Sequence, residues 1–294
     1  MTALQGTEPV APARPRGAGG VRRLKRALLY LAALAVSAFA LFPIYWVVIT
    51  SLKPRDEIYT RTPHLWTSHP NWSQYPTVLG DGHVGRALLN SLIVAGCTTV
   101  ICLVVSALAA YALARLELPA RGVLLMLVLM TQMFPLVVLV IPLFVIMRKA
   151  DLLGTYWGLV IAYLAFTVPL AIWVMRGFLI TIPKELEHAA RIDGATRLGA
   201  MWRVILPLAA PGLATTAVLC FLEGWKEFML ALTFINDENR KTLPLALQSF
   251  VGRGDTDWGA IMATSVIYTL PVALVFLVLR RHLMTVRTAG ALKG

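Results

Sequence analysis

Lys184-Glu-Leu-Glu-His-Ala-Ala-Arg-Ile-Asp-Gly-Ala-Thr196 is a polar stretch between two long apolar runs, residues 152–175 and 204–222. Its pattern predicts a short helix, a glycine turn and a second helix that re-enters an apolar run through Val204-Ile-Leu-Pro207. A chain this apolar has little reason to hold such a structure outside the hydrocarbon unless something docks there. The stretch therefore predicts a docking site for a soluble partner.

The composition indicates a membrane protein. Of the 294 residues, 58% are hydrophobic and only 14% are charged, which is too apolar for a soluble globule. Roughly 20 apolar residues cross about 30 Å of hydrocarbon. We predict an all-α polytopic membrane protein with six transmembrane helices and a cytoplasmic helix between the fourth and fifth. The charge-free runs that predict the spans are residues 27–52, 87–114, 122–147, 152–175, 204–222 and 258–279.

The fifth run is the shortest of the six. We expect it to continue through Glu223, Lys226 and Glu227 to about Phe234, because the residues from Phe228 onward are apolar again.

Lys and Arg residues are unequally divided between the two sides. If the N-terminus is cytoplasmic, the inner connections carry clearly more Lys and Arg than the outer ones. Because cytoplasmic loops retain positive charge, both termini and the polar stretch are predicted to be cytoplasmic. The net charge of +12 lies at these membrane flanks, where anionic headgroups account for it, so no nucleic-acid partner is expected.

The remaining composition excludes other kinds of site. Residues 1–26 are predicted to be a disordered, basic cytoplasmic tail, since the first twenty are rich in Ala, Pro and Gly. Cys97, Cys102 and Cys220 all fall inside spans without metal-like spacing to histidine, so neither a disulfide framework nor a metal site is expected.

Polar side chains inside the third and fourth spans are candidates for a substrate path. Gln132 shares the third span with Pro135 and Pro142, and Tyr163 lies six residues before Pro169 in the fourth. Proline kinks a membrane helix and is tolerated where a neighbouring helix or a water-filled cavity satisfies the freed carbonyl. A kink used only for packing is an equal alternative for each span.

The strongest signal within a span is Glu223-Gly-Trp-Lys-Glu227. An ionisable group at this depth costs about 2.5–3.5 kcal/mol unless it is paired or hydrated. Glu223, Lys226 and Glu227 are expected to share one helix face, because they are three and four residues apart, and a Glu223–Lys226 pair would offset part of the cost. The patch either lines a translocation cavity or locks the fifth helix against its neighbours. The substrate-path candidates are therefore Gln132, Tyr163, Glu223, Trp225, Lys226 and Glu227.

The polar stretch has a defined local structure. Pro183 is tolerated in a first helical turn, and Ala189 and Ala190 present a flat surface that another protein can approach closely. Gly194 supplies the positive φ that ends the first helix, and Thr196 caps the second.

These residues resemble the coupling motif of ATP-binding-cassette importer permeases, written Glu-Ala-Ala, three residues, Gly, nine residues, Ile, one residue, Leu-Pro. Ala189-Ala190, Gly194, Val204 and Leu206-Pro207 match in register. Other segments are similar to the carbohydrate-uptake branch, which includes MalG-type subunits of maltose and trehalose importers. They are Ser51-Leu-Lys-Pro54, Asn90-Ser-Leu92, Ala110-Tyr-Ala-Leu-Ala-Arg115, Ile192-Asp-Gly-Ala195, Trp225-Lys-Glu-Phe228 and Gly290-Ala-Leu-Lys-Gly294. The resemblance covers residues 27–294.

The resemblance implies a type I importer permease fold and a set of partners. They are a MalF-like second permease, a dimer of a MalK-like ATPase, an extracytoplasmic sugar-binding protein and the sugar itself, in the bacterial cytoplasmic (inner) membrane. This chain has no Gly-x4-Gly-Lys-Ser/Thr loop, so it is not expected to be an enzyme, and ATP and Mg belong to the ATPase. The residues implied to couple to the ATPase are Glu187, His188, Ala189, Ala190, Asp193, Gly194 and Pro207, with Gly290, Lys293 and Gly294 as a C-terminal contact.

Two residues depart from the family pattern. His188 stands at the motif's glutamate, which in the family reaches into the ATPase and pairs with a basic residue. Either His188 itself or Glu187, one place earlier, is the residue expected to make this contact. We expect His188→Glu to retain or strengthen docking, whereas a complex that falls apart would show that His188 is adapted to a changed partner. Lys226 stands where many relatives carry Asn, a change that either creates the Glu223–Lys226 pair or reshapes a sugar contact.

The expected organisation is a tail at residues 1–26, a permease domain at 27–282 with the coupling loop at 181–207, and a C-terminal tail at 283–294. An α-glucoside such as maltose, maltodextrin or trehalose is the favoured substrate, and glycerol-phosphate or a polyol is the alternative. An ATPase-independent secondary transporter is less favoured because no internal repeat is visible. A membrane-embedded enzyme is also less favoured. It would need Asp, His or Glu side chains clustered at one depth, and only Glu223 and Glu227 lie within a span.

Overall fold

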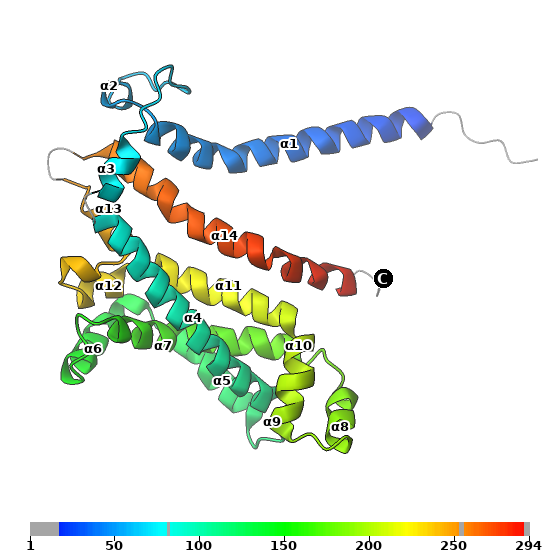
Figure 1. The fold of residues 1–294 in the computed structure, drawn as a ribbon. Coiled ribbons are helices and arrows are strands. Elements are labelled where there is room, and N and C mark those ends of the chain that lie inside the picture. Colours follow the sequence, from blue (N-terminus) through cyan, green and yellow to red (C-terminus); the bar gives the residue numbers. More distant parts are fainter. Residues whose placement is uncertain (1–17, 81–82, 253–255, 291–294) are drawn as a thin grey trace, which may run out of the picture.

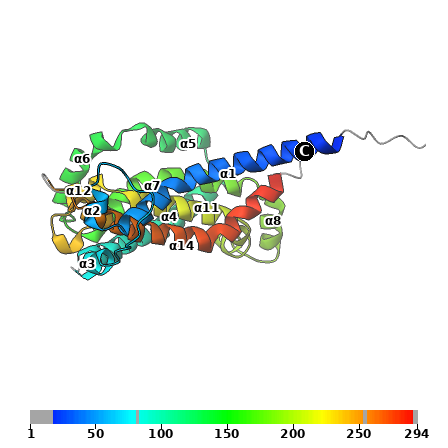
Figure 2. The same cartoon turned by 90° about the horizontal axis from the view of Figure 1, so that it is seen from above.

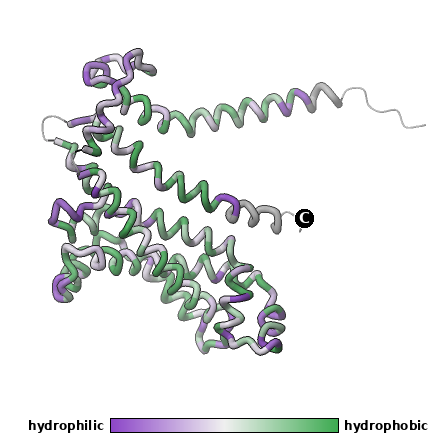
Figure 3. The backbone as a smooth tube through the Cα atoms, in the orientation of Figure 1, coloured by the Kyte–Doolittle hydropathy of each residue, from purple (hydrophilic) through white to green (hydrophobic). Residues whose placement is uncertain are grey.

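The computed structural model describes residues 18–80, 83–252 and 256–290. Within these ranges every regular element is helical, as the composition predicts (Figure 1). Hydrophobic residues cover the long helices, and hydrophilic residues gather near their ends (Figure 3). This is the distribution expected of helices that cross a bilayer.

Four helices are long and apolar enough to cross a membrane singly. They are α1 (Ala18–Ser51), α4 (His83–Arg115), α7 (Tyr156–Leu179) and α14 (Trp258–Gly290). Two further candidates are bent pairs of helices. If each bent pair counts as one crossing, the described residues contain six, in agreement with the predicted number.

The first bent pair is α5 (Arg121–Met130) and α6 (Leu136–Lys149), joined by the turn η1 (Thr131–Met133) with a bend of 97°. The sequence predicts one kinked span here, so the prediction is wrong about its continuity. Phe134 adopts an extended conformation (ψ 124°) and Pro135 caps α6. A residue before proline is disfavoured in the helical region, which favours a break at Phe134, whereas α6 continues through Pro142.

The second bent pair differs from the predicted fifth span at both ends. Its first part comprises α9 (Arg197–Ala200), the π-helical turn η2 (Met201–Ile205) and α10 (Leu206–Leu208). An 81° bend leads to α11 (Ala210–Lys226). Glu227 is extended, and α12 (Met229–Phe234) is a separate helix. The predicted continuous helix to Phe234 is therefore wrong.

The centre of the molecule is formed by α4, α7 and α11, which pack against one another. A Cβ on Gly224 of α11 would lie 3.3 Å from the Cα of Ala95 in α4, so these two helices meet backbone to backbone. Small residues permit this close approach. Close packing is important in a membrane, because the hydrophobic effect does not drive helices together in lipid.

α1 stands apart from this bundle and packs mainly on α14 (Figure 1). Its most apolar stretch buries none of its residues against the rest of the described chain. Seen from above, α5 and α6 lie at one edge of the molecule and α3 at the opposite edge (Figure 2).

Short helices occupy the two ends of the bundle. One end carries α2 (Arg55–Ile58), α3 (Gln74–Gly80), η3 (Glu238–Arg240) and α13 (Leu243–Gln248). The other end carries α8 (Lys184–Ile192), close to the start of α1 and the end of α14 along the long axis in both views (Figures 1 and 2).

The helical ends extend beyond the predicted domain limits. α1 already begins at Ala18, so residues 18–26 of the expected tail are helical, and residues 1–17 lie outside the described part. α14 continues to Gly290, beyond the expected end of the permease domain at residue 282.

Candidate functional site

The loop from α8 to α9 has the predicted local structure. Gly194 has φ +90°, a conformation that favours glycine, and follows directly after the residue that ends α8. The Ala195 amide donates 3.0 Å to the Ala190 carbonyl, which closes the helix end. Thr196 Oγ1 accepts from the Gly199 amide at 3.0 Å and caps α9. Turn and cap fix the angle between the two helices.

One face of α8 is anchored to the bundle through Glu187. The Tyr111 hydroxyl of α4 donates to Glu187 Oε1 at 2.5 Å. Arg115 Nε lies 3.5 Å from Glu187 Oε2, and Arg115 Nη2 donates 2.8 Å to the Ile182 carbonyl. Glu187 is only 7% exposed. Its charge is therefore directed to this chain's own helix α4 rather than outward.

The opposite face of α8 is open. His188, Ala189 and Asp193 are exposed, Ala190 is partly exposed, and Ile192 is 86% exposed. Pro207 is also exposed, on α10. An isoleucine with this exposure at the end of a polar helix is an apolar contact point that nothing in the described chain covers.

Sequence reasoning did not find Tyr111 and Arg115 as part of this site. Both lie in Ala110-Tyr-Ala-Leu-Ala-Arg115, a segment that carries part of the family resemblance. Nothing in the sequence indicates that this segment contacts the loop between α8 and α9. The hydrogen bond from Tyr111 to Glu187 spans 76 residues.

Glu223 and Lys226 form the predicted ion pair. Lys226 Nζ lies 2.8 Å from Glu223 Oε1, and the two side chains are 63% and 42% exposed, respectively. Charges exposed on a membrane-spanning helix are costly unless they face water or another protein. This face of α11 is therefore expected to border a hydrated cavity or a partner subunit.

Glu227 does not share the helix face of Glu223 and Lys226. Its carboxylate accepts from the amides of Leu230 at 2.7 Å and Ala231 at 3.1 Å, which are donors of the first turn of α12. The carboxylate thus caps α12 at the point where α11 stops. Tyr163 is 2% exposed, and its hydroxyl has no hydrogen-bond partner among the described residues although it lies beside Glu227.

Trp225 is a core residue in this conformation. It is 2% exposed and stacks between Phe221 and Tyr268, at ring-centroid distances of 5.4 and 5.3 Å. Its Nε1 donates 3.2 Å to the Tyr268 carbonyl, and the Tyr268 hydroxyl donates 3.1 Å to the Trp225 carbonyl. These contacts join α11 to α14.

Gln132 lies in the bend between α5 and α6 and is exposed. Its Nε2 donates 2.9 Å to the Phe166 carbonyl of α7. That carbonyl lies three residues before Pro169, next to the carbonyl that the proline deprives of its helical donor. The amide therefore meets a partner helix, as a polar group in a span requires.

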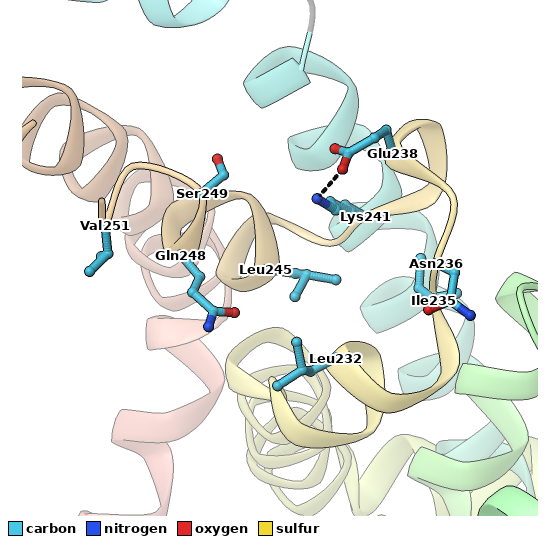
Figure 4. Close-up of a pocket in the computed structure, with 9 residues that line it drawn as sticks. All are labelled: Leu232, Ile235, Asn236, Glu238, Lys241, Leu245, Gln248, Ser249 and Val251. Carbon is cyan, nitrogen blue, oxygen red and sulfur yellow. Dashed lines mark hydrogen bonds and ion pairs between the residues drawn. The ribbon is translucent and has the colours of Figure 1, made fainter. Parts of the chain in front are cut away.

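The end of the bundle opposite α8 carries a cavity of about 450 Å³ between α12, α13 and the loop that joins them. Gln248 and Leu245 of α13 and Leu232 of α12 line it, and Lys241 pairs with Glu238 at 2.5 Å on its rim (Figure 4). Asn90 of α4 donates to the carbonyls of Asn239 and Lys241 at 2.9 and 2.8 Å, which fastens this loop to the bundle.

The predicted C-terminal contact is described only in part. Gly290 is the last residue of α14, and Lys293 and Gly294 lie outside the described residues. Among the described residues no three His, Cys, Asp or Glu side chains are arranged to hold a metal ion.

The chain matches characterised proteins over most of its length. The sequence model described as "binding-protein-dependent transport system inner membrane component" matches residues 102–285. The sulfoquinovosyl glycerol transport system permease protein SmoH of Agrobacterium fabrum is 38% identical, covering 91% of this chain and 94% of that protein. The trehalose/maltose transport system permease protein MalG of Thermococcus litoralis is also 38% identical, covering 92% and 98%.

A solved structure has the same fold. It is the crystal structure of a bacterial ABC transporter involved in the import of the acidic polysaccharide alginate, with a TM-score of 0.75 and 24% sequence identity. The match covers 92% of this chain and 99% of that chain.

Proposed function

The chain belongs to the family of binding-protein-dependent transport system inner membrane components, and on this premise we propose that it is the permease subunit of an ATP-driven carbohydrate importer. Proteins of this family are non-catalytic, multi-pass subunits of the inner membrane. They work with an ATPase, a partner permease and a binding protein. In our proposal these are a MalK-like ATPase dimer, a MalF-like permease and an extracytoplasmic sugar-binding protein, with ATP and Mg held by the ATPase.

The single observation that carries the proposal is the open face of α8. A helix anchored to α4 through Glu187, with His188, Ala189 and Ile192 exposed on its other side, is a contact surface for a second protein. The ATPase would contact this face together with Asp193, Gly194 and Pro207, and the C-terminal residues Gly290, Lys293 and Gly294. Movement of the ATPase would then reach the bundle through α4.

The orientation is part of the proposal. α8 lies at the same end of the molecule as the start of α1 and the end of α14 (Figures 1 and 2). This arrangement supports a cytoplasmic location for both termini and for the coupling loop at 181–207, in line with the distribution of Lys and Arg. The cavity lined by Leu232 and Gln248 would then open on the outer side, where a binding protein delivers sugar.

The proposed substrate is a glycoside, with an α-glucoside such as maltose, maltodextrin or trehalose as the first choice. Equal identity to proteins named for sulfoquinovosyl glycerol and for trehalose/maltose supports the glycoside class. Half of the sugar path would be lined by this chain. The exposed pair Glu223–Lys226 and the exposed Gln132 are the side chains that support a hydrated path next to the partner permease.

Uptake assays in cells test the proposal. The gene is deleted, and uptake of labelled trehalose, maltose and maltotriose is compared with that of a strain carrying the gene on a plasmid. We expect uptake of at least one of these sugars to require the chain. Purification of the tagged chain from the same membranes should recover an ATPase and a second permease.

Two results would refute the proposal. The first is a purified chain that, without any ATPase, moves sugar into liposomes. The second is unchanged uptake of all three sugars in the deletion strain together with recovery of the chain alone.

A further inference from the structure

A cavity of about 470 Å³ lies between α8, the end of α4 and the start of α9. It opens on the proposed cytoplasmic surface, beside the exposed face of α8. Most of the side chains that line it are basic: Arg115, Lys184, His188, Arg191 and Arg197, with Leu116, Glu117 and Glu187.

The acidic side chains of the cavity do not balance this charge. Glu187 and Arg115 neutralise each other within the wall, where both side chains are at least nine-tenths buried. Lys184, Arg191 and Arg197 are exposed, and no ion pair to them is found among the described residues. Glu117 is the single remaining acid in the lining.

Arg115 is the buried basic side chain of the cavity lining. Its Nε has no hydrogen-bond partner in the described structure, because the Glu187 carboxylate at 3.5 Å is beyond hydrogen-bond distance. A buried guanidinium N–H without a hydrogen-bond acceptor is costly, so the wall of the cavity keeps an unsatisfied positive donor next to the exposed basic side chains.

From this cavity we infer that the coupling surface is an anion-binding site, and that Asp or Glu side chains of the ATPase enter it. The inference rests on the proposed function. It reverses the polarity of the family's contact, in which a permease glutamate reaches a basic residue of the ATPase. Here His188 stands in place of that glutamate, and Glu187 is turned inward to Tyr111 and Arg115.

Protein carboxylates fit the cavity better than a lipid phosphate does. Leu116 is the one apolar side chain among its described lining residues, so acyl chains attached to a headgroup would find little apolar surface within it. The adjacent Ile192, 86% exposed, offers an apolar contact of the kind that a protein surface covers. An approaching acidic surface would also be steered by the excess positive charge.

Carbodiimide cross-linking of the intact complex tests the inference directly, because this reagent joins a lysine amine to a carboxylate without a spacer. Complex purified from native membranes is cross-linked and analysed by mass spectrometry. We expect Lys184 to be joined to an Asp or Glu of the ATPase. Lys184→Arg keeps the charge but removes the amine, so this cross-link should disappear while the ATPase is still recovered.

Charge reversal supplies the second measurement. Arg191→Glu should lower the amount of ATPase recovered about tenfold, with greater loss at high salt. Arg121→Glu is the matched control, since Arg121 is exposed at the start of α5 but does not line the cavity. On this inference His188→Glu also weakens docking, which is the opposite of the expectation from the family motif.

The outcomes separate the inference from the proposed function. If ATP-driven sugar uptake holds but Lys184 is joined to no ATPase carboxylate, and Arg191→Glu and Arg121→Glu behave alike, the inference is overturned and the proposed function stands. Loss of a bound phospholipid in Arg191→Glu with full recovery of ATPase would also overturn it. Wild-type chain that recovers no ATPase at any salt would refute the proposed function itself.

Discussion

The Tyr111 hydroxyl donates a 2.5 Å hydrogen bond to the Glu187 carboxylate, which joins α4 to α8 across 76 residues of sequence. α4 is also the helix against which α7 and α11 pack. Any displacement of α8 therefore acts first on the helix at the centre of the bundle. The anchor is compact, because Arg115 of the same helix contacts Glu187 and the Ile182 carbonyl.

Tyr111→Phe removes this hydrogen bond while keeping the ring. A hydrogen bond to a charged group contributes about 1.5–3 kcal/mol, so α8 should be held less firmly against α4. We expect the complex to assemble, with sugar-stimulated ATP hydrolysis and uptake several-fold lower. Tyr30→Phe, on the exposed face of α1, is the control. Unchanged coupling in Tyr111→Phe would exclude this hydrogen bond from transmission.

Gly194 tests the turn between α8 and α9. At φ +90° a β-branched side chain is strained, whereas Asn tolerates positive φ better than most residues. Gly194→Val, like Gly194→Pro, should insert into the membrane but uncouple ATP hydrolysis from uptake. Gly194→Asn should keep much of the coupling. Normal sugar-stimulated hydrolysis in Gly194→Val would count against the coupling role of the loop.

Gly212 tests the packing of α11 on α7. A Cβ at this position would lie 2.6 Å from Phe178 Cγ, too close for any real contact. Overpacking of this kind costs about 1–3 kcal/mol, so Gly212→Ala should lower the thermal unfolding midpoint in detergent. Gly96→Ala in α4 meets nothing within 4 Å and should leave the midpoint unchanged or raise it. Equal midpoints for the two variants would contradict this packing.

Glu227 tests whether the second carboxylate of the patch is structural or contacts sugar. Loss of a helix cap costs about 0.5–2 kcal/mol. Glu227→Ala leaves the amide N–H groups of Leu230 and Ala231 without this acceptor, so it should lower the thermal unfolding midpoint. Glu227→Gln keeps an acceptor and should recover most of this loss. A Glu227→Gln variant with normal stability but a raised KM for sugar would instead indicate substrate contact.

The sequence was sufficient to predict the features that depend on local chemistry. Apolar length predicts where helices cross, and the Gly194 turn and Thr196 cap follow from residues adjacent to them. The Glu223–Lys226 pair was also predictable, because both residues share one turn of helix. The roles in coupling and in the substrate path that are assigned to these residues stay predictions.

Features that depend on backbone direction or distant neighbours could not be predicted. Hydropathy is the same for a straight span and for two helices bent by 97° at Phe134, because it measures composition alone. Nothing in the sequence indicates that Glu187 has partners within the chain, so it is a candidate there for contact with the ATPase. Its partners Tyr111 and Arg115 belong to a different span. From the sequence, Glu227 is predicted to lie in the middle of a continuous fifth helix. In the structure α11 ends just before it, and its carboxylate accepts hydrogen bonds from amides in the first turn of α12.

The separation of α1 from the bundle has a consequence for biosynthesis. α1 is synthesised before the other described helices, and its main neighbour, α14, is synthesised after them. During translation α1 must therefore remain in the bilayer without its main neighbour, surrounded by lipid, until α14 is inserted. Contacts between such distant segments form late in folding. A chain truncated before α14 would leave α1 without its main neighbour, so the pairing of α1 with α14 requires synthesis of both ends of the described chain.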